Sequence, residues 1–429
     1  MKLGRGFIRA LKALSLFPLM TCFHMAICRD NAHFYRPPLF WGEPRFERPS
    51  LSTAAMLLTG GSASTSRNSS GNKESTLLNL YGFENLHHIG DNVPSVSAGN
   101  PLETLVNNLN DLPDRGTFGQ VKYFGQFSLF EGALLVQQNF TKGFFGEVYM
   151  PIRQLKIEMI GFNDKTPADN IEPHRYTQTW LDFLGGYQTI LAHYGLTAGR
   201  VETTGFGDIT IMAGWTTNYQ DTRELDYIDA TIKTGILLPT GHEKNENSVF
   251  DLPTGYNGHY GFPFSIDASL GAFEWLTVGA NLGGIIFSEK EKIVRMRTSS
   301  LQNGFIKLAK GTALVRPGTV WHLGAYVKLD HIHDAFSWTT AYSFNQRLST
   351  KYLPSNTGTF PYPVVNGDEQ LQSWSMHVIH IVWEFDLGAE GNTAMPNVTF
   401  LMNIPVGGQR IFNTMTGGAA GEVNMTWHF

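Results

Sequence analysis

Histidine side chains could bind a metal ion, but their spacing in this sequence does not bring a set of ligands together. His331 and His333 share one face of an expected strand and sit in a short turn. His377 and His380 are an odd number of residues apart, so they face opposite sides of a strand. A zinc site needs three or four converging ligands. We therefore expect no metal and no other cofactor.

Nucleophilic catalysis is the second chemistry to consider. Gly258-His259-Tyr260-Gly261 partly matches the Gly-His-x-Ser motif of a phospholipase built on a β-barrel, but glycine stands where the nucleophilic serine belongs. Such catalysis needs a hydroxyl within hydrogen-bond reach of a base, and the sequence shows no such pairing. No glycine loop leads from a strand into a helix to hold phosphate. The sequence therefore predicts that the protein is not an enzyme.

The first 28 residues read as a secretory signal peptide. Four basic residues and no acidic residue accompany the apolar run 13–20. Cleavage near Cys28 would remove both cysteines, so the mature chain would hold no disulfide or thiolate site. It would also leave 28 basic against 37 acidic residues, a formal net charge of -9. A membrane anchor, or a lipid on Cys22 or Cys28, is the alternative.

The composition of the chain favours a β-barrel in lipid. Of 429 residues only 16% are charged, while 13% are aromatic and 45 are glycine. The low charge argues against a disordered chain, and the net negative charge argues against a nucleic-acid partner. Beyond the signal peptide no apolar run reaches about 18 residues, which excludes a helical membrane protein.

Runs of about ten residues with alternating polarity begin at residue 119, as transmembrane strands require. In 262–271, for example, Phe262, Phe264 and Ile266 fall on one face, and Ser265 and Asp267 on the other. Residues 29–118 read as a low-order N-terminal extension or as a plug, and 119–429 as the barrel. The expected strands are 120–130, 133–141, 144–153, 206–219, 226–240, 261–273, 276–288, 313–330, 336–352, 371–388, 396–406 and 420–429.

The connections between these strands alternate between short turns and long loops. We expect the short turns, such as 141–143 and 274–275, on the periplasmic side, where both termini of such a barrel lie. The hairpin near Glu131-Gly132 is the exception to this alternation. The longest loop, 154–205, has apolar residues at helical spacing over 176–194. The fold class is therefore all-β: a membrane-spanning antiparallel β-barrel of about 12 strands, with one helical insertion in an outer loop.

Three short motifs resemble a known family. Gly205-Phe206-Gly207-Asp208 opens a strand, Lys233–Gly241 closes the next outward strand with Pro-Thr-Gly, and Asn403–Gly408 forms a late corner. They resemble the corresponding segments of the meta-pathway phenol-degradation outer-membrane proteins. The resemblance covers about residues 119–429. It implies a barrel in the bacterial outer membrane that passes small apolar or aromatic compounds.

The last strand ends on an aromatic residue. Val423, Met425, Trp427 and Phe429 share one face of 421–429. Exported barrels with this ending resemble substrates of the barrel-assembly machinery, which would read Phe429. The other expected partners are outer-membrane lipid, lipopolysaccharide and a small apolar solute.

The alternation also predicts which side chains meet a solute. Charged residues on the polar face should line the lumen as permeation or plug contacts: Lys122, Glu147, Asp229, Lys233, Asp267, His322, Lys328 and Arg347. Aromatic residues of the outer loops should contact the solute: Tyr176, Trp180, Tyr187 and Tyr256. The sequence thus predicts a channel or transporter that passes small hydrophobic or aromatic molecules by passive diffusion. The alternative is a structural or surface-interaction barrel with a filled lumen and partner-binding outer loops.

Overall fold

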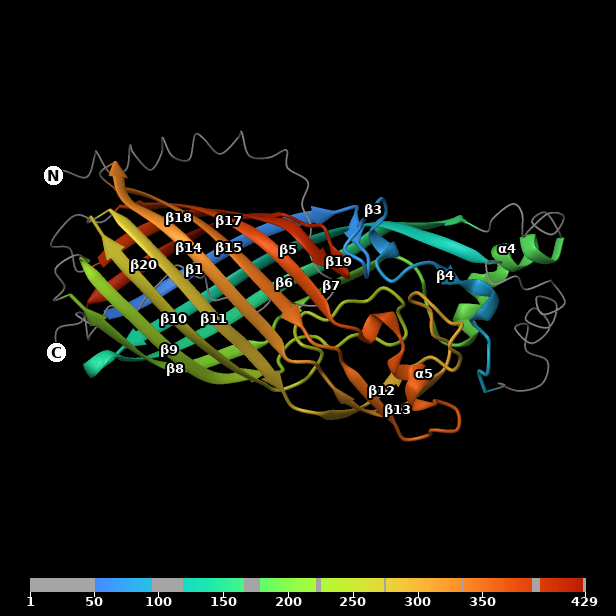
Figure 1. Ribbon diagram of the computed structural model, residues 1–429. Helices are drawn as coiled ribbons and strands as arrows, with labels where there is room; N and C mark the ends of the chain where they lie inside the picture. Colours follow the sequence, from blue (N-terminus) through green and yellow to red (C-terminus); the bar gives the residue numbers. More distant parts are fainter. Residues whose placement is uncertain are drawn as a thin grey trace.

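The computed structural model describes residues 51–94, 119–165, 178–220, 225–273, 275–333, 335–387 and 394–426. Long antiparallel strands form a closed barrel, and β1 starts at the same end of the barrel at which β20 finishes (Figure 1). The opposite end carries most of the loop structure. Within the described residues, no helix is long and apolar enough to cross a membrane.

In the described residues, twelve antiparallel strand positions, here called staves, make up the barrel wall; one of them is formed by two consecutive strands. In chain order they are β1 (Leu51–Ala63), β5 (Gln120–Asn139), β6 (Phe144–Asp164), β7 (Val201–Phe206) continued by β8 (Ile209–Tyr219), β9 (Tyr227–Leu238), β10 (Gly261–Ala272), β11 (Leu276–Phe287), β14 (Val320–His333), β15 (Phe336–Arg347), β17 (Trp374–Asp386), β18 (Ala394–Gln409) and β20 (Thr416–Thr426). Each stave pairs antiparallel with its neighbours. The ring closes because β1 pairs with both β20 and β5.

The predicted fold class and strand number are confirmed, but two strands need correction. The hairpin expected near Glu131-Gly132 is wrong, because β5 runs unbroken and pairs with β6 from Val121 to Asn139. The missing twelfth stave is β1, so the wall starts at residue 51 rather than at 119. Its sequence, LSTAAMLLTGGSA, mixes small and apolar residues on both faces and therefore hides the alternation.

The outward face of the wall is apolar. Exposed large side chains alternate with buried ones along the staves, as in Phe262, Ile266 and Leu270 of β10. Exposed aromatic rings concentrate near the two ends of the staves, including Trp215 and Trp275 at the short turns and Phe206 and Trp321 towards the loops. An apolar band between aromatic girdles is the outer surface of a membrane-spanning barrel.

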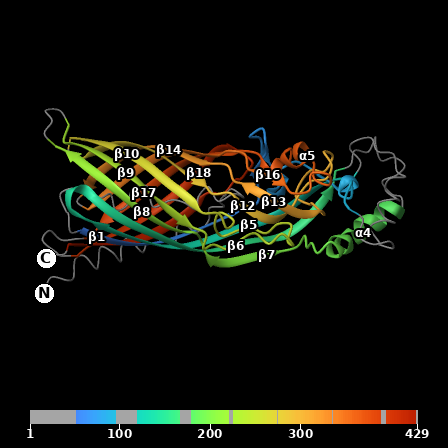
Figure 2. The same cartoon turned by 90° about the horizontal axis from the view of Figure 1, so that it is seen from below.

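The loops between staves fold into one structure at the end opposite the short turns, here called the loop cap (64–94, 178–200, 239–260, 288–319, 348–373 and 410–415). Figure 2 shows the cap continuing beyond the ends of the staves. The predicted helical insertion is confirmed as α4 (Gln178–His193). The other short elements of the cap are β2 (Ser66–Arg67), β3 (Lys73–Glu74), η2 (Leu77–Asn79), β4 (Glu84–Asn85), η3 (Leu86–His88), β12 (Lys290–Arg295), β13 (Lys310–Arg316), β16 (Lys351–Pro354), α5 (Tyr362–Asn366), η6 (Glu369–Leu371) and β19 (Ile411–Phe412). At the other end, η4 (Thr141–Gly143) forms a short turn.

Candidate functional site

Large aromatic side chains on the inner wall lie against glycines of the neighbouring stave. A Cβ atom on Gly279 would come within 2.3 Å of the Tyr326 ring, and one on Gly271 within 2.1 Å of the Tyr227 ring. The same arrangement places Phe145 over Gly214. Rings in this orientation lie along the barrel wall and do not extend across the barrel. The inward glycines therefore make room for bulky side chains of the neighbouring stave on the inner wall.

A buried ion pair joins β5 to β6. The Arg153 guanidinium contacts the Glu131 carboxylate, and both side chains are nearly inaccessible to solvent. Tyr149 donates a hydrogen bond to Glu131 (3.2 Å), and Arg153 donates another to the carbonyl oxygen of Thr254 in the loop cap (2.5 Å). The buried Arg153 side chain therefore connects the barrel wall to the loop cap. Glu131 and Arg153 lie on the same inward face of the wall as Glu147. The alternation of polarity could therefore have predicted them as inward-facing residues.

Two of the motifs noted in the sequence meet where the stave of β7 and β8 is interrupted. The Asp208 carboxylate accepts hydrogen bonds from the backbone N–H of Gly241 (2.9 Å) and of Tyr256. The Thr240 hydroxyl donates to the carbonyl of Gly207 (2.7 Å). The break inserts one extra residue, so the inward positions are odd-numbered in β7 and even-numbered in β8. The hydrogen bonds between the two motifs therefore stabilise the wall where β7 and β8 are interrupted.

Seven of the eight expected lumen residues lie on the face opposite the exposed apolar side chains; they are Glu147, Asp229, Lys233, Asp267, His322, Lys328 and Arg347. Several are paired. Lys233 lies 3.2 Å from Glu147, and Lys328 lies 2.8 Å from Glu384. Asn218 donates to Asp229 (2.5 Å), and Ser265 donates to Asp267 (3.1 Å). Ion pairs and hydrogen bonds thus hold several of these polar groups, and their part in permeation stays a prediction.

Lys122 is the exception. It shares the outward face of β5 with the exposed Phe124 and Phe130, so the expectation that it faces the lumen is wrong. Its ammonium lies 3.0 Å from the Glu74 carboxylate of the cap. This ion pair satisfies the charge of a lysine that stands at the loop end of its stave.

A chain of hydrogen-bonded polar side chains crosses five adjacent staves on the inner wall. It starts at His322 on β14, whose Nδ1 lies 2.7 Å from the Asn345 amide oxygen on β15. The Asn345 amide donates to Ser343 (3.3 Å), which lies 2.8 Å from His380 on β17. The last two links, from His380 to Asn403 (2.6 Å) and from Asn403 to Thr416 (2.8 Å), reach β18 and β20. We call this set the inner chain.

The expected aromatic contacts of the outer loops take different places. Tyr187 of α4 is buried in the cap, where its hydroxyl lies 3.2 Å from that of Tyr123. The Tyr256 ring packs against the Phe287 ring at a tilt of 42°, with the ring centroids 4.8 Å apart. Tyr176 and the side chain of Trp180 lie outside the described residues. Tyr187 is therefore part of the packed interior of the cap rather than of an open mouth.

In the part of the chain that the structure describes, no hydroxyl group forms a hydrogen bond with the histidine of the partial phospholipase motif. His259 is buried, and its Nδ1 lies 3.0 Å from the backbone oxygen of Ser288. Burial lowers the pKa of His259 to about 4. Among the described residues, no three histidine, cysteine, aspartate or glutamate side chains come together as metal ligands would.

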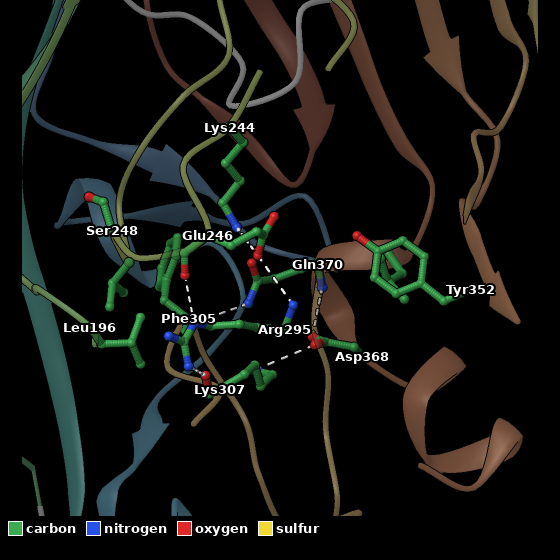
Figure 3. A pocket seen from close by; sticks show the side chains of 12 residues that line it. Leu196, Lys244, Glu246, Ser248, Arg295, Phe305, Lys307, Tyr352, Asp368 and Gln370 are labelled. Atoms are coloured by element: carbon green, nitrogen blue, oxygen red, sulfur yellow. Dashed lines mark hydrogen bonds and ion pairs between the residues drawn. The ribbon is translucent and has the colours of Figure 1, made fainter. Parts of the chain in front are cut away.

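A small crevice opens in the loop cap between loops that are distant in sequence (Figure 3). Apolar side chains such as Leu196 and Phe305 line it together with charged ones, among them Lys307. Glu84 is fully buried close by and accepts hydrogen bonds from the backbone N–H of Phe305 (2.6 Å) and Ile306 (3.0 Å). Burial raises the pKa of Glu84 to about 7, although the Lys307 charge and the two N–H groups act in the opposite direction. The cap thus contains a carboxyl group that titrates near neutral pH.

No protein-family model matches the chain, and no curated protein sequence matches it. Similar solved structures include an outer membrane channel from Pseudomonas putida, with a TM-score of 0.49 and 8% identity over 90% of this chain and 98% of that chain. The toluene transporter TbuX of Ralstonia pickettii has a TM-score of 0.31 and 9% identity, covering 88% of this chain and 90% of its own. The translocator domain of the autotransporter NalP from Neisseria meningitidis has a TM-score of 0.35 and 10% identity, covering 88% of each chain.

Proposed function

We propose that the protein is a channel of the bacterial outer membrane that passes small hydrophobic or aromatic molecules by passive diffusion. A continuous run of aromatic rings supports this proposal. Ring contacts of 5.2 to 5.8 Å connect Tyr81, Phe305, Phe250, Tyr123, Phe162 and Tyr187. These rings come from several cap loops and from the cap ends of β5 and β6. Most of these rings are buried in the packed cap, so a solute that follows them to the barrel wall must displace side chains of the cap, where it meets apolar contacts.

Passive diffusion fits the composition of the inner wall. Paired charges and small residues bind an apolar solute weakly, so a solute that leaves the aromatic run would not be retained. Permeation needs no bond to be made or broken. The signal peptide 1–28, recognition of Phe429 by the assembly machinery and contacts with lipopolysaccharide belong to the same proposal. Residues 1–28 and Phe429 lie outside the described residues.

Uptake measurements test the proposal. The protein is expressed in a porin-deficient strain, and uptake of a radiolabelled monoaromatic hydrocarbon is compared with that of the empty strain. We expect faster uptake with the protein, and Phe250→Ala should slow it several-fold because it interrupts the aromatic run. Phe360→Ala is the matched control, since Phe360 is a buried cap phenylalanine (4% exposed) that packs in a different cluster, outside the aromatic run. Uptake equal to that of the empty strain would favour the structural barrel with partner-binding loops.

A further inference from the structure

The donors of the inner chain all point one way around the wall. The amide oxygen of Asn345 can only accept, so His322 donates to it and the Asn345 nitrogen faces Ser343. At the other end the Asn403 nitrogen donates to Thr416, which leaves its oxygen for the Nδ1–H of His380. A neutral imidazole carries one N–H, so Nε2 of His380 is an acceptor. With His380 neutral, the Ser343 hydroxyl donates its hydrogen bond to Nε2.

This arrangement contains the elements of a hydrolytic triad. Oγ of Ser343 lies 2.8 Å from Nε2 of His380, and Nδ1 lies 2.6 Å from the Asn403 oxygen that orients the ring. Nucleophile, base and orienting group are thus in the order and at the nitrogen atoms that acyl transfer requires. Ser343 is 0% exposed and His380 is 3% exposed, so bulk water does not weaken these bonds.

We propose that Ser343, His380 and Asn403 hydrolyse small carboxylic esters of apolar acids or alcohols inside the barrel. This activity goes beyond the proposed transport function and does not depend on it. Ser343 and His380 are the catalytic residues, and Asn403 is a positioning residue.

The reaction balances with water as the second substrate. The Ser343 oxygen forms a bond to the ester carbonyl carbon while its proton moves to Nε2 of His380. The bond from that carbon to the leaving oxygen then breaks, and His380 returns the proton to give the free alcohol. Water attacks the acyl-serine and gives its proton to His380. Breakdown of this second intermediate releases the carboxylic acid and restores the Ser343 hydroxyl.

An amide side chain beside Ser343 would support the attack. The Asn345 amide nitrogen lies 3.3 Å from Oγ of Ser343 and would provide an N–H donor for the oxyanion that forms. On the neighbouring stave, Gly324 pairs with Ser343 in register, and a Cβ atom on Gly324 would lie 2.6 Å from the Asn281 amide oxygen of the stave beyond. Because Ser343 is fully buried, only a small acyl group that displaces neighbouring side chains can reach it.

A small serine reagent tests the nucleophile. The purified, folded protein in detergent is treated with methanesulfonyl fluoride, and the modified serine is located by mass spectrometry. We expect Ser343 to react at least about 100-fold faster than Ser337, because a positioned general base contributes about 10²–10⁴ in rate. Ser337 is the matched internal control, since it lies on the same stave and the same inward face and is 7% exposed. Equal labelling of both serines, or no labelling of Ser343, would overturn the proposal.

Substitutions of His380 and Ser343 test the general base and the nucleophile. His380→Gln should slow labelling of Ser343 and release of 4-nitrophenolate from 4-nitrophenyl acetate by about 100-fold. Ser343→Ala should abolish both, and Ser337→Ala should leave them unchanged. Heat-modifiable migration on a detergent gel identifies the folded fraction of each variant. Undiminished labelling of folded His380→Gln would refute a catalytic role for this histidine.

Two substitutions of Asn403 separate positioning from a purely structural role. Asn403→Asp keeps an oxygen beside Nδ1 of His380 and should retain labelling of Ser343. Asn403→Leu removes that oxygen and should slow the labelling. Slow labelling of folded Asn403→Asp, or undiminished labelling of folded Asn403→Leu, would contradict the role of Asn403. Aromatic uptake by the same variants reports on the channel separately.

Discussion

The wall and the cap satisfy two of their buried carboxyl groups, Glu131 and Glu84, in different ways. In the wall, Glu131 faces the Arg153 guanidinium and the Tyr149 hydroxyl. In the cap, Glu84 accepts two backbone N–H groups and has the Lys307 charge nearby. A direct ion pair holds the carboxylate of Glu131, whereas Glu84 is held mainly by backbone amide donors and its pKa is raised to about 7 by burial. The cap should therefore respond to pH through Glu84.

Breaking the ion pair of the wall should have the largest effect. Arg153→Met leaves the Glu131 carboxylate buried without its counter-charge, which costs about 3–5 kcal/mol of unfolding free energy. Urea unfolding of the protein in detergent, followed by the heat-modifiable band, measures this loss. Arg200→Met removes an exposed pair with Glu202 and should leave the midpoint unchanged. Partial recovery in the double variant Glu131→Gln/Arg153→Met would show that the uncompensated charge is the cause.

The cap should loosen as the pH rises. The pKa of Glu84 is raised from 4.5 to about 7 in the folded cap, so the folded cap holds this proton more tightly than open loops do. Its stabilisation is complete below pH 4.5 and is lost as the pH rises through 7, by about 3 kcal/mol in all. Limited proteolysis of the cap between pH 5 and 8 measures the change. Glu84→Gln should flatten the pH dependence, and an unchanged slope in that variant would assign it to another group.

Weakening the hydrogen bonds of Asp208, at the break between β7 and β8, should have a smaller effect. Asp208→Asn keeps the shape of the side chain but leaves one oxygen to accept from Gly241 and Tyr256. The loss of one such buried hydrogen bond costs about 1–3 kcal/mol. Faster protease cleavage within 239–260 would report it. Glu291→Gln, at an exposed position of β12, is the control and should cleave as the unmodified protein does.

The smallest change should come from the inner wall. Gly279→Ala places a Cβ in the space of the Tyr326 ring, which must swing away from the wall into the barrel. We expect a loss of about 1 kcal/mol in stability and a lower single-channel conductance. Gly421→Ala has no atom within 4 Å of the new Cβ and serves as the control. Equal conductance in the two variants would show that the ring stays against the wall.

The alternation of polarity predicts the wall because a strand in lipid must be apolar on one face. It placed the strands at 261–273 and 276–288, and the structure has β10 at Gly261–Ala272 and β11 at Leu276–Phe287. It failed at β1, where small and apolar residues stand on both faces, and at Glu131, whose charge next to Gly132 resembled a turn. The cap has no such period, and its packing depends on contacts between distant loops.

The inner chain shows a second limit of sequence reasoning. Ser343 and His380 are 37 residues apart, and they meet because the register of β15 and β17 pairs Ala341 with His380. A shift of one residue in that pairing would turn one set of side chains to the other face. The sequence shows the serine and the histidine but not this register, so no pairing of a hydroxyl with a base could be predicted.

The closing stave also has a consequence for the order of assembly. β1 pairs with β20 from Leu51 opposite Thr426 to Gly60 opposite Gly417, across nearly the whole described chain. Contacts between residues so distant in sequence form slowly, because the intervening chain must first be brought together. The ring cannot close before its last stave arrives, so until then β1 presents an unpaired edge. Whatever holds the chain during insertion must shield that edge from other chains until β20 completes the ring.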